Sequence, residues 1–270
     1  MPKILQLNEQ KKDLEYWLNH VEDAWSEIPD DKSIRQIKHI AFICDGNRRS
    51  ARLKGLDENH GYSLGIEVIK GIAKACRQWE IKHTTFWTFS TENWLRSNTQ
   101  VSFLMQLAKK YLNDKEIVDQ LIENKVKFTH LGRKNKLAYS IRKSLTDLEK
   151  QTASFEKYFL NMALDYGGVD ELARAVQKIL KDASKKGMID IENNPELLFD
   201  YLDTGGQPFP DLVVRTGFNS NEVPRTSGFM PLQTSYSGWL FLECFFPDLT
   251  PEVLLEQIKE FATYEMRLGK

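Results

Sequence analysis

A short stretch near the start of the chain has the residue types of a phosphate-binding turn. The run Ile40–Cys44 is apolar, which predicts a buried strand, and Asp45 and Gly46 end it abruptly. Gly46 permits a tight turn, and Arg48 and Arg49 follow directly. N–H groups at a helix start and arginine forks bind phosphate, and a carboxylate can hold Mg²⁺. These residues therefore predict a site for a metal-bound polyphosphate, although they also suit an ordinary turn before a solvated basic helix.

Two later segments place more hydrogen-bonding and cationic side chains behind predicted strands. The run 84–89 predicts a strand that leads into the polar segment 90–96, and the run 212–215 predicts another near the C-terminus. Parallel strands bring their carboxyl ends to one edge of a sheet, where ligands collect. We therefore expect one site built from three segments. Asp45, Ser90, Asn93 and Arg215 are the residues expected at this edge.

Strand and helix patterns alternate along the chain, which is typical of a parallel sheet flanked by helices. Strands are predicted at 40–44, 84–89, 126–131, 158–164, 212–215 and 239–242. Helices are predicted at 8–27, 62–79, 101–124, 137–148, 171–181, 195–203 and 251–267. The predicted fold class is α/β, a single domain with a central, mostly parallel β-sheet of about six strands and helices on both faces.

The composition limits the classes of protein to which the chain can belong. With 270 residues, 41% of them hydrophobic, it can bury one large core without a second globular domain. A formal net charge of -1 argues against an electrostatic nucleic-acid binder. No run approaches the roughly 18 apolar residues of a membrane span, and Cys44, Cys76 and Cys244 lack disulfide or zinc spacing. We expect a cytoplasmic protein with free thiols, no nucleic-acid partner and no transmembrane segment.

In this order, the three segments resemble the motifs of the cis-prenyltransferases, the undecaprenyl diphosphate synthase-like enzymes. The first block of the family is usually H-x-A-x-x-M-D-G-N-G-R-W-A, and residues 39–51 read H-I-A-F-I-C-D-G-N-R-R-S-A. The F-S-(S/T)-E-N-W block is intact at 89–94, and D-L-V-I-R-T-G occurs at 211–217 with Val214 in place of isoleucine. The resemblance runs from about His39 to Arg267 and implies the cis-prenyltransferase fold.

The reaction implied by this resemblance joins an allylic diphosphate to isopentenyl diphosphate and releases diphosphate. The family normally uses Mg²⁺, so the resemblance makes Asp45 the residue that handles the metal and the leaving group. Ser90 and Asn93 would take part in a proton relay, because hydroxyl and amide groups both donate and accept hydrogen bonds. The residues expected to hold the two isoprenyl diphosphates are Gly46, Asn47, Arg48, Arg49, Arg96, Arg215, Arg225 and Ser227, with Arg49 on the allylic substrate.

The family also implies a tunnel for the prenyl chain, lined by the predicted helices 62–79 and 101–124. Thr88 and Phe103 stand where members with long products usually have small residues. We therefore expect a short tunnel and a short product.

Several positions depart from the family pattern, and they lie at the expected chemistry. Arg48 replaces a glycine, Glu58 stands where a diphosphate-binding arginine is usual, and Gly238 occupies the position of an acid that completes the Mg²⁺ site from the partner subunit. Some of these changes give a partial likeness to cyclolavandulyl diphosphate synthase, a divergent member that joins two dimethylallyl diphosphates head-to-middle. Two alternatives thus stand beside the main interpretation: a head-to-middle or cyclising synthase, and a non-catalytic diphosphate-binding partner subunit.

The remaining expectations concern domain organisation and partners. We divide the chain into an N-terminal helical extension, residues 1–34, and a cis-prenyltransferase catalytic domain, residues 35–270. The resemblance implies a homodimer. It also leaves room for transient contact with a membrane surface.

Overall fold

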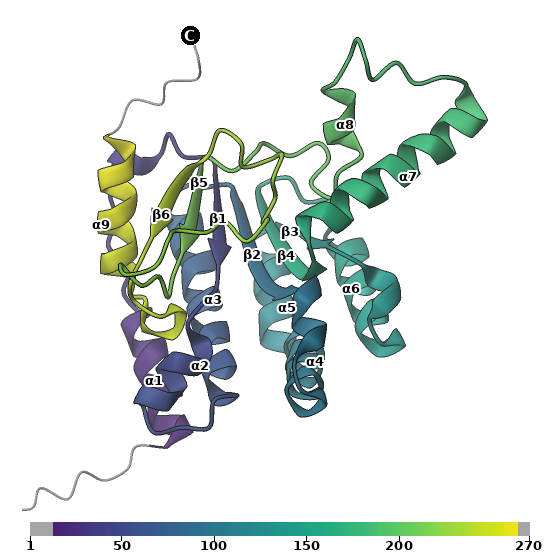
Figure 1. Cartoon of the computed structure of the whole chain (residues 1–270). Helices are drawn as coiled ribbons and strands as arrows, with labels where there is room; N and C mark the ends of the chain where they lie inside the picture. The colour runs from purple at the N-terminus through teal and green to yellow at the C-terminus, as the bar shows by residue number, and fades with distance from the viewer. Residues whose placement is uncertain (1–12, 264–270) are drawn as a thin grey trace, which may run out of the picture.

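A parallel β-sheet forms the centre of the molecule. The computed structural model describes residues 13–263 of the chain (Figure 1). The strand order is β3-β4-β2-β1-β5-β6, and every neighbouring pair runs parallel, which confirms the predicted fold class. The strands are β1 (His39–Ile43), β2 (His83–Ser90), β3 (Val126–Leu131), β4 (Tyr158–Tyr166), β5 (Leu212–Arg215) and β6 (Gly238–Phe241).

Helices connect the strands and cover the sheet. None of those in residues 13–263 has the length and apolar composition needed to cross a membrane. The α-helices are α1 (Leu14–Ala24), α2 (Asn47–Leu53), α3 (His60–Gln78), α4 (Asn98–Leu112), α5 (Lys115–Glu123), α6 (Tyr139–Thr152), α7 (Gly168–Lys186), α8 (Leu197–Asp200) and α9 (Pro251–Ala262).

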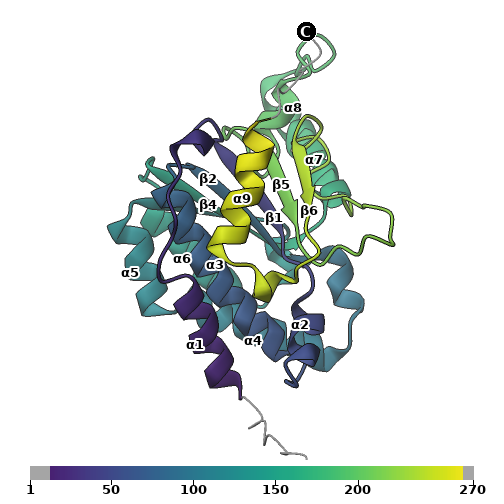
Figure 2. The same ribbon diagram turned by 90° about the vertical axis from the view of Figure 1, so that its left-hand side faces the viewer.

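The side chains of β1 alternate between two hydrophobic cores, one on each face of the sheet. Ile40 and Phe42 pack with residues of α1, α3 and α9, whereas Ala41 and Ile43 pack with Phe229 on the opposite face. All five residues of β1 are buried, as expected for a strand covered on both faces. Figure 2 shows α3 and α7 on opposite sides of the sheet. Both faces are therefore closed, and the carboxyl edge of the strands is left for a site.

The predicted helix 101–124 is wrong as a single element, because the chain breaks it into α4 and α5. The carboxylate of Asp114 accepts hydrogen bonds from the backbone N–H groups of Glu116 and Ile117, at 3.0 and 3.3 Å. Aspartate caps a helix N-terminus well and is unfavourable inside a helix, so the same residue ends one element and starts the next. The break turns α5 so that it packs against β3.

Other predicted bounds change at the ends of the elements. The predicted helix 195–203 reduces to the four-residue α8, and the predicted helix 251–267 ends at Ala262 in α9. The predicted helix 8–27 corresponds to α1, which begins at Leu14. The predicted residues 8–12 and 264–267 lie outside the described residues.

Helix α1 packs into the main core through its last turn and C-cap. Trp25 is 3% exposed, and its indole N–H donates to the carbonyl of Leu249 at 3.1 Å. The indole also lies directly over Gly71 of α3, where a Cβ atom would come within 2.3 Å of the ring. Gly71 is therefore required by the close approach of α1 to α3.

We expect Gly71→Ala to destabilise the protein, with a sign opposite to that of helix propensity. Alanine in an exposed helix stabilises by up to about 1 kcal/mol relative to glycine. Overpacking against Trp25 should instead cost about 1–3 kcal/mol, measured as the free energy of unfolding in urea. In a Trp25→Ala background the same Gly71→Ala change should become stabilising. A stabilising effect in the wild-type background would contradict this packing.

Candidate active site

The turn after β1 lies at the mouth of a cavity. Its Asp45 is the only carboxylate among the described residues that line this cavity. Gly46 has φ +97° and precedes the first turn of α2, and its N–H donates to Asp45 Oδ1 at 2.6 Å. A Cβ atom at Gly46 would lie 2.7 Å from the ring of Phe245, so both its backbone angle and its surroundings require glycine. This turn directs the side chain of Asp45 along the carboxyl ends of the strands, toward Arg215 at the end of β5.

Two arginines from separate segments hold the carboxylate of Asp45. Arg49, one turn into α2, donates to Oδ1 at 3.2 Å, and Arg215, the last residue of β5, donates to Oδ2 at 3.2 Å. The side chain of Asp45 remains 40% exposed, so it keeps access to a ligand. The two guanidinium groups supply more positive charge than one carboxylate can neutralise, which favours an anion between them.

The two arginines have further contacts that fix their orientation. Arg49 donates to the carbonyl of Gly217 at 2.8 Å and stacks on the ring of Phe245, with its guanidinium carbon 5.0 Å from the centroid. Arg215 donates to Ser227 Oγ at 2.8 Å and to the carbonyl of Arg225. These contacts hold the guanidinium groups in place, so little ordering is left for ligand binding.

The predicted residues of the third segment separate into two groups. Arg215 and Ser227 lie together beside Asp45, and Ser227 lines the cavity. The side chain of Arg225 is exposed and is absent from the cavity lining, and only its carbonyl contacts Arg215. In this conformation Arg225 orients Arg215 through its backbone.

Ser90 and Asn93 meet at the cavity mouth through a reciprocal cap. They form a capping box at the start of a 3₁₀ turn, in which the N–H of Ser90 donates to Asn93 Oδ1 at 3.1 Å. Just before this turn, β2 shifts its register against β4 on either side of Phe89. This irregularity brings the adjacent side chains of Thr88 and Phe89 to the same cavity, although neighbours in a regular strand face opposite ways.

More cationic groups surround the mouth of the cavity. Arg96 donates to the hydroxyl of Tyr62 at 2.6 Å, and both residues line the cavity. Burial raises the pKa of Tyr62, so its phenol stays neutral. Arg48 and Arg52 both pair with Glu58, which lies outside the lining. The mouth is therefore positively charged, and Asp45 is the only acidic residue in its lining among those that the structure describes.

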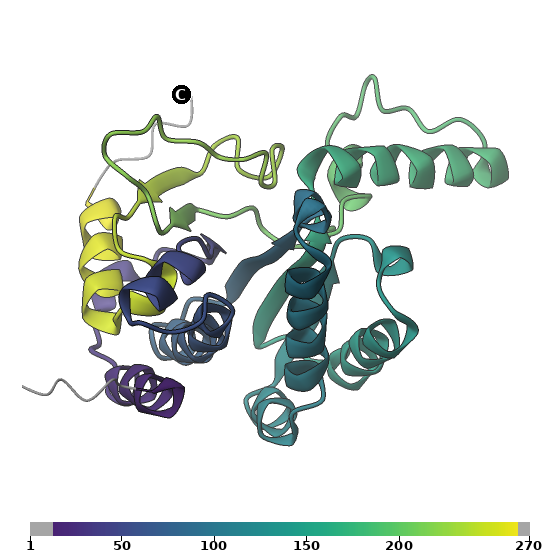
Figure 3. The same ribbon diagram turned by 60° about the horizontal axis from the view of Figure 1, so that its bottom comes forward.

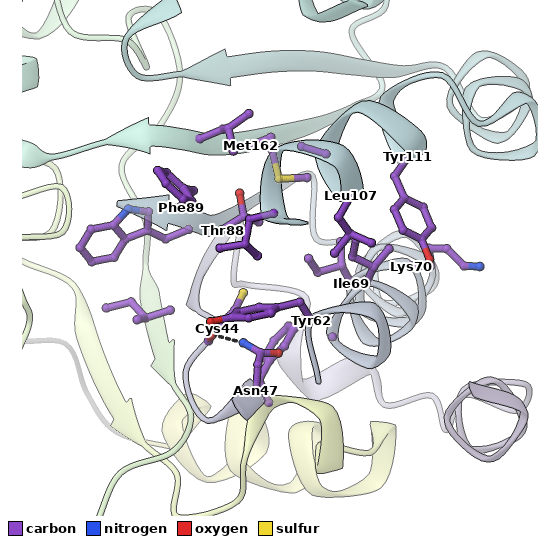
Figure 4. A pocket seen from close by; sticks show the side chains of 18 of the residues that line it. Cys44, Asn47, Tyr62, Ile69, Lys70, Thr88, Phe89, Leu107, Tyr111 and Met162 are labelled. Carbon is purple, nitrogen blue, oxygen red and sulfur yellow. Dashed lines mark hydrogen bonds between the residues drawn. The ribbon is translucent and has the colours of Figure 1, made fainter. Parts of the chain in front are cut away.

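A cavity of about 570 Å³ extends from this mouth into the molecule. It lies between the sheet and the helices α3, α4 and α5, and Figure 3 shows α3 next to α4 on the same side of the sheet. Figure 4 shows Thr88, Phe89 and Met162 along one wall, with Tyr62 opposite. Most of the deeper lining is apolar: Ile66, Ile69, Ala73, Leu104, Leu107, Ala108, Leu112, Ile117, Leu121, Phe128, Leu160, Met162 and Leu164.

Polar side chains also line the cavity away from the mouth. Near the middle of α3, Lys70 pairs with Glu67, and the pKa of Tyr111 is raised to about 12 by burial and by the nearby Glu67. Further along α3, Arg77 lines the cavity together with Gln120 of α5, and burial lowers the pKa of Arg77. Between Tyr62 at the mouth and Arg77, α3 rises about 22 Å at 1.5 Å per residue. The cavity thus has a cationic mouth, an apolar middle and a polar inner end.

The structure overturns one sequence-based expectation, shows a further contact of Asn47, which also lines the cavity, and adds two lining residues. Phe103 does not line the cavity, so the prediction that it narrows the tunnel is wrong, whereas Thr88 does line it. Asn47 is 8% exposed and donates to the carbonyl of Cys44 at 2.7 Å, which ties the turn together. Arg77 and Gln120 were not predicted as site residues, because each occurs singly in a helix of mixed composition.

The donor set at the mouth suits a metal that arrives with a phosphate ligand. Within residues 13–263 no group of three His, Cys, Asp or Glu side chains could hold a metal by itself. Mg²⁺ commonly uses one or two carboxylates and completes its coordination with water and phosphate oxygens. Gly238, at the first position of β6, lies at the opposite edge of the sheet, and a Cβ atom there would lie 2.1 Å from the ring of Phe261. Within residues 13–263, Asp45 is the one carboxylate that lines this mouth.

Comparisons with known proteins agree with this geometry. Residues 43–269 match the family described as putative undecaprenyl diphosphate synthase. An isoprenyl transferase of Clostridium tetani is 38% identical over 86% of this chain and 89% of its own length, and one from Bacillus anthracis is 36% identical over 86% and 88%. A probable undecaprenyl diphosphate synthase of Campylobacter jejuni superposes with a TM-score of 0.68 at 29% identity, over 87% of this chain and 99% of its own.

A fourth protein shares the fold alone. It is the lavandulyl diphosphate synthase of Lavandula x intermedia, whose structure was solved in complex with dimethylallyl diphosphate. It superposes with a TM-score of 0.79 at 24% identity, over 87% of this chain and 99% of its own.

We expect Arg49→Met and Arg215→Met each to weaken the binding of inorganic pyrophosphate by about tenfold or more, because each removes a charge-assisted hydrogen bond to the anion. Isothermal titration calorimetry measures this directly. Arg35→Met serves as the control, since Arg35 pairs with Glu80 away from the cavity. Equal affinity in all three variants would contradict an anion site between Arg49 and Arg215.

Proposed function

Because the chain belongs to the undecaprenyl diphosphate synthase-like family of cis-prenyltransferases, we propose that Asp45 and the surrounding arginines bind two isoprenyl diphosphates at the cavity mouth. The protein is an isoprenyl transferase, and its reaction is prenyl condensation. The substrates that we assign are an allylic diphosphate and isopentenyl diphosphate.

One observation carries this assignment: a guanidinium pair on Asp45 stands at the entrance of an apolar cavity. An isoprenyl diphosphate has the matching polarity, with a multiply charged head and a hydrocarbon tail. The head fits between Arg49 and Arg215, and the tail fits the apolar middle of the cavity. Burying the tail then contributes binding free energy that increases with each buried carbon.

The proposed reaction breaks the bond between C1 of the allylic substrate and its diphosphate oxygen. The double bond of isopentenyl diphosphate supplies the electron pair for the new carbon–carbon bond to C1, and the adduct then loses a proton. Arg49 stabilises the charge that builds up on the leaving diphosphate, and Arg215 with Ser227 holds the second diphosphate. The arginines thereby offset the electrostatic repulsion between the two diphosphate groups, so that both substrates can bind close together.

We assign the proton step to the segment that begins at Ser90. Within residues 13–263 the amide nitrogen of Asn93 donates to no protein acceptor, while its oxygen is held by the N–H of Ser90. That amide can therefore bind a diphosphate oxygen of the second substrate. The proton moves to the leaving diphosphate, with the Ser90 hydroxyl as the group that can accept and donate it.

We also assign Mg²⁺ to this mouth as a cofactor that binds together with a diphosphate. Asp45 is the residue that would hold it, and the ion would neutralise charge on the leaving group. Because Asp45 is already paired with two arginines, metal binding without diphosphate should be weak. Until a diphosphate takes over their contacts, Arg49 and Arg215 hold the carboxylate that would bind the ion.

The decisive experiment is Asp45→Ala, assayed with isopentenyl and farnesyl diphosphates and mass spectrometry of the products. We expect turnover to fall by about a hundredfold or more, because the variant loses charge handling at the leaving group. Circular dichroism should show an unchanged fold, since Asp45 is partly exposed. Asp190→Ala, which removes an exposed carboxylate outside the cavity, is the matched control. Near-normal turnover in a folded Asp45→Ala protein would refute the assignment.

We propose a short product, because the inner end of the cavity is poorly suited to hydrocarbon. A prenyl chain that grew along α3 would meet Arg77, which has no ion-pair partner within residues 13–263. Removing water from an unpaired guanidinium is unfavourable. Thr88 adds a polar group to the wall nearer the mouth, where its hydroxyl donates to the carbonyl of Ala163 at 3.1 Å.

Arg77→Met should therefore shift the products to longer chains, since it removes the charge and leaves an unbranched apolar side chain. Arg77→Lys should leave the distribution unchanged. Lys74→Met, on the same helix and outside the cavity lining, is the matched control. Liquid chromatography with mass spectrometry measures the chain lengths. Long products from the wild-type protein, or an unchanged distribution in Arg77→Met, would contradict a polar stop.

A head-to-middle synthase is the second candidate function. The observation that favours it is the ion pairing of Glu58 with Arg48 and Arg52, because these residues change the cationic pattern of the mouth. Incubation with dimethylallyl diphosphate alone distinguishes the two functions. A branched or cyclic ten-carbon product would support this second candidate.

We propose that the protein forms a homodimer through α7. Val169, Ala173, Val176 and Leu180 are exposed and spaced four, three and four residues apart, which places them in one stripe along the helix. Helix α7 extends beyond the edge of the sheet (Figure 1). A second copy of α7 would cover this apolar stripe. We also place the protein in the cytoplasm, in keeping with its three free cysteines Cys44, Cys76 and Cys244.

The double variant Val176→Glu/Leu180→Glu should be monomeric, because it introduces like charges into a stripe that would meet its own copy. Size-exclusion chromatography with light scattering measures the mass. The control is Gln177→Glu/Lys181→Glu, which adds the same residues at exposed positions of α7 outside the stripe. A monomeric wild-type protein would rule out this interface.

A further inference from the structure

Asp165, at the end of β4, occupies an unfavourable position for a carboxylate. Its side chain is 0% exposed, and its backbone has φ +55°, in the left-handed region. Aspartate adopts this region more readily than most residues, but a fully buried charge is still unfavourable unless several groups bind it. Neither the cavity lining nor the proposed reaction includes Asp165.

Three hydrogen bonds reach the carboxylate of Asp165 from two directions. Arg133 donates twice, from Nε to Oδ2 at 3.1 Å and from Nη2 to Oδ1 at 2.7 Å. The indole N–H of Trp94 donates to Oδ1 at 2.8 Å. The backbone N–H of Arg133 also donates to the carbonyl of Asp165 at 3.0 Å. Arg133 neutralises the buried charge, which leaves Asp165 as a fixed acceptor for Trp94.

Trp94 directly follows Asn93 in the 3₁₀ turn at the cavity mouth. Its ring meets Phe89 edge-on, with centroids 5.3 Å apart, so one side is packed while the N–H points to Asp165. Asn93 and Ser90 line the cavity, but Trp94 does not. An indole fixed at both ends therefore fixes the backbone from which Asn93 projects.

From these contacts we infer that Asp165 and Trp94 are positioning residues: the hydrogen bond between them sets the orientation of Asn93 at the reacting centre. Arg133 makes the buried carboxylate of Asp165 tolerable. The inference rests on the proposed function, because the proposed function assigns Asn93 to the proton step. Asp165 then has two separate roles: its hydrogen bond to Trp94 serves the reaction, and its ion pair with Arg133 serves stability.

The first variant is Trp94→Phe, which keeps the ring contact with Phe89 and removes the N–H donor. We expect kcat to fall by about tenfold, the size of effect for one lost hydrogen bond to a charged group, with both KM values within about twofold of wild type. Trp25→Phe is the matched control, because it also removes one buried indole hydrogen bond, to the carbonyl of Leu249. This control should lower the melting temperature and leave kcat unchanged.

The second variant is Asp165→Asn, the conservative replacement that keeps an oxygen for the indole and tolerates the left-handed backbone. We expect it to retain kcat within about twofold, because one hydrogen-bond acceptor remains, while its melting temperature falls from loss of the ion pair with Arg133. Wild-type kcat in Trp94→Phe overturns the inference, as does an equal kcat loss in a folded Asp165→Asn. If Asp165→Asn does not fold, the comparison of Trp94→Phe with Trp25→Phe decides alone.

Hydrogen–deuterium exchange of residues 90–96 tests the same inference without turnover. Trp94→Phe should exchange these amides faster than wild type, and Trp25→Phe should not. Unchanged exchange in Trp94→Phe overturns the positioning role even if the wild-type protein shows no prenyl transfer. Absence of product from wild type with faster exchange in Trp94→Phe would instead refute the proposed function and leave the hydrogen bond established.

Discussion

The pairing of Asp45 with Arg49 and Arg215 is the interaction around which the site is organised. It joins the end of β1, the first turn of α2 and the end of β5, which are far apart in the sequence. These partly exposed groups satisfy one another through charge-assisted hydrogen bonds in the protein without substrate. The same groups become available to a diphosphate and its metal when a substrate enters. The charged side chains at the mouth are thus held in place before substrate binds, and they can still exchange one another for a substrate.

The parallel sheet explains why an apolar cavity lies directly behind this charged mouth. Strands covered on both faces leave only their carboxyl edge for polar chemistry. The space between the sheet and the α3–α5 layer is lined with apolar side chains, apart from its polar inner end. A break at Asp114 allows both α4 and α5 to contribute to this lining. The site for the diphosphate head and the cavity for the hydrocarbon tail therefore lie next to each other because of the same arrangement of sheet and helices.

A second charged cluster supports the site from behind. Asp165 and Arg133 form a buried pair, and Trp94 connects that pair to the turn of Ser90 and Asn93. On the outer side, Arg174 joins Asp170 to Asp203 and so ties α7 to the loop before β5. The carboxylates of Asp165 and Asp203 are thus each neutralised by an arginine from another segment of the chain.

The chain by itself determined the order of strands and helices, because strand and helix periodicities are local properties of the sequence. It also marked Asp45, Arg49 and Arg215 as candidates, since Asp45 directly follows one apolar strand, Arg49 lies four residues further on and Arg215 ends another strand. Spacing could not reveal that Phe103 lies outside the cavity while Arg77 lies in it, because that depends on which sides of α4 and α3 face the sheet. Nor could it pair Trp94 with Asp165, 71 residues apart. Such contacts depend on how separate elements pack in three dimensions, and only the tertiary structure decided them.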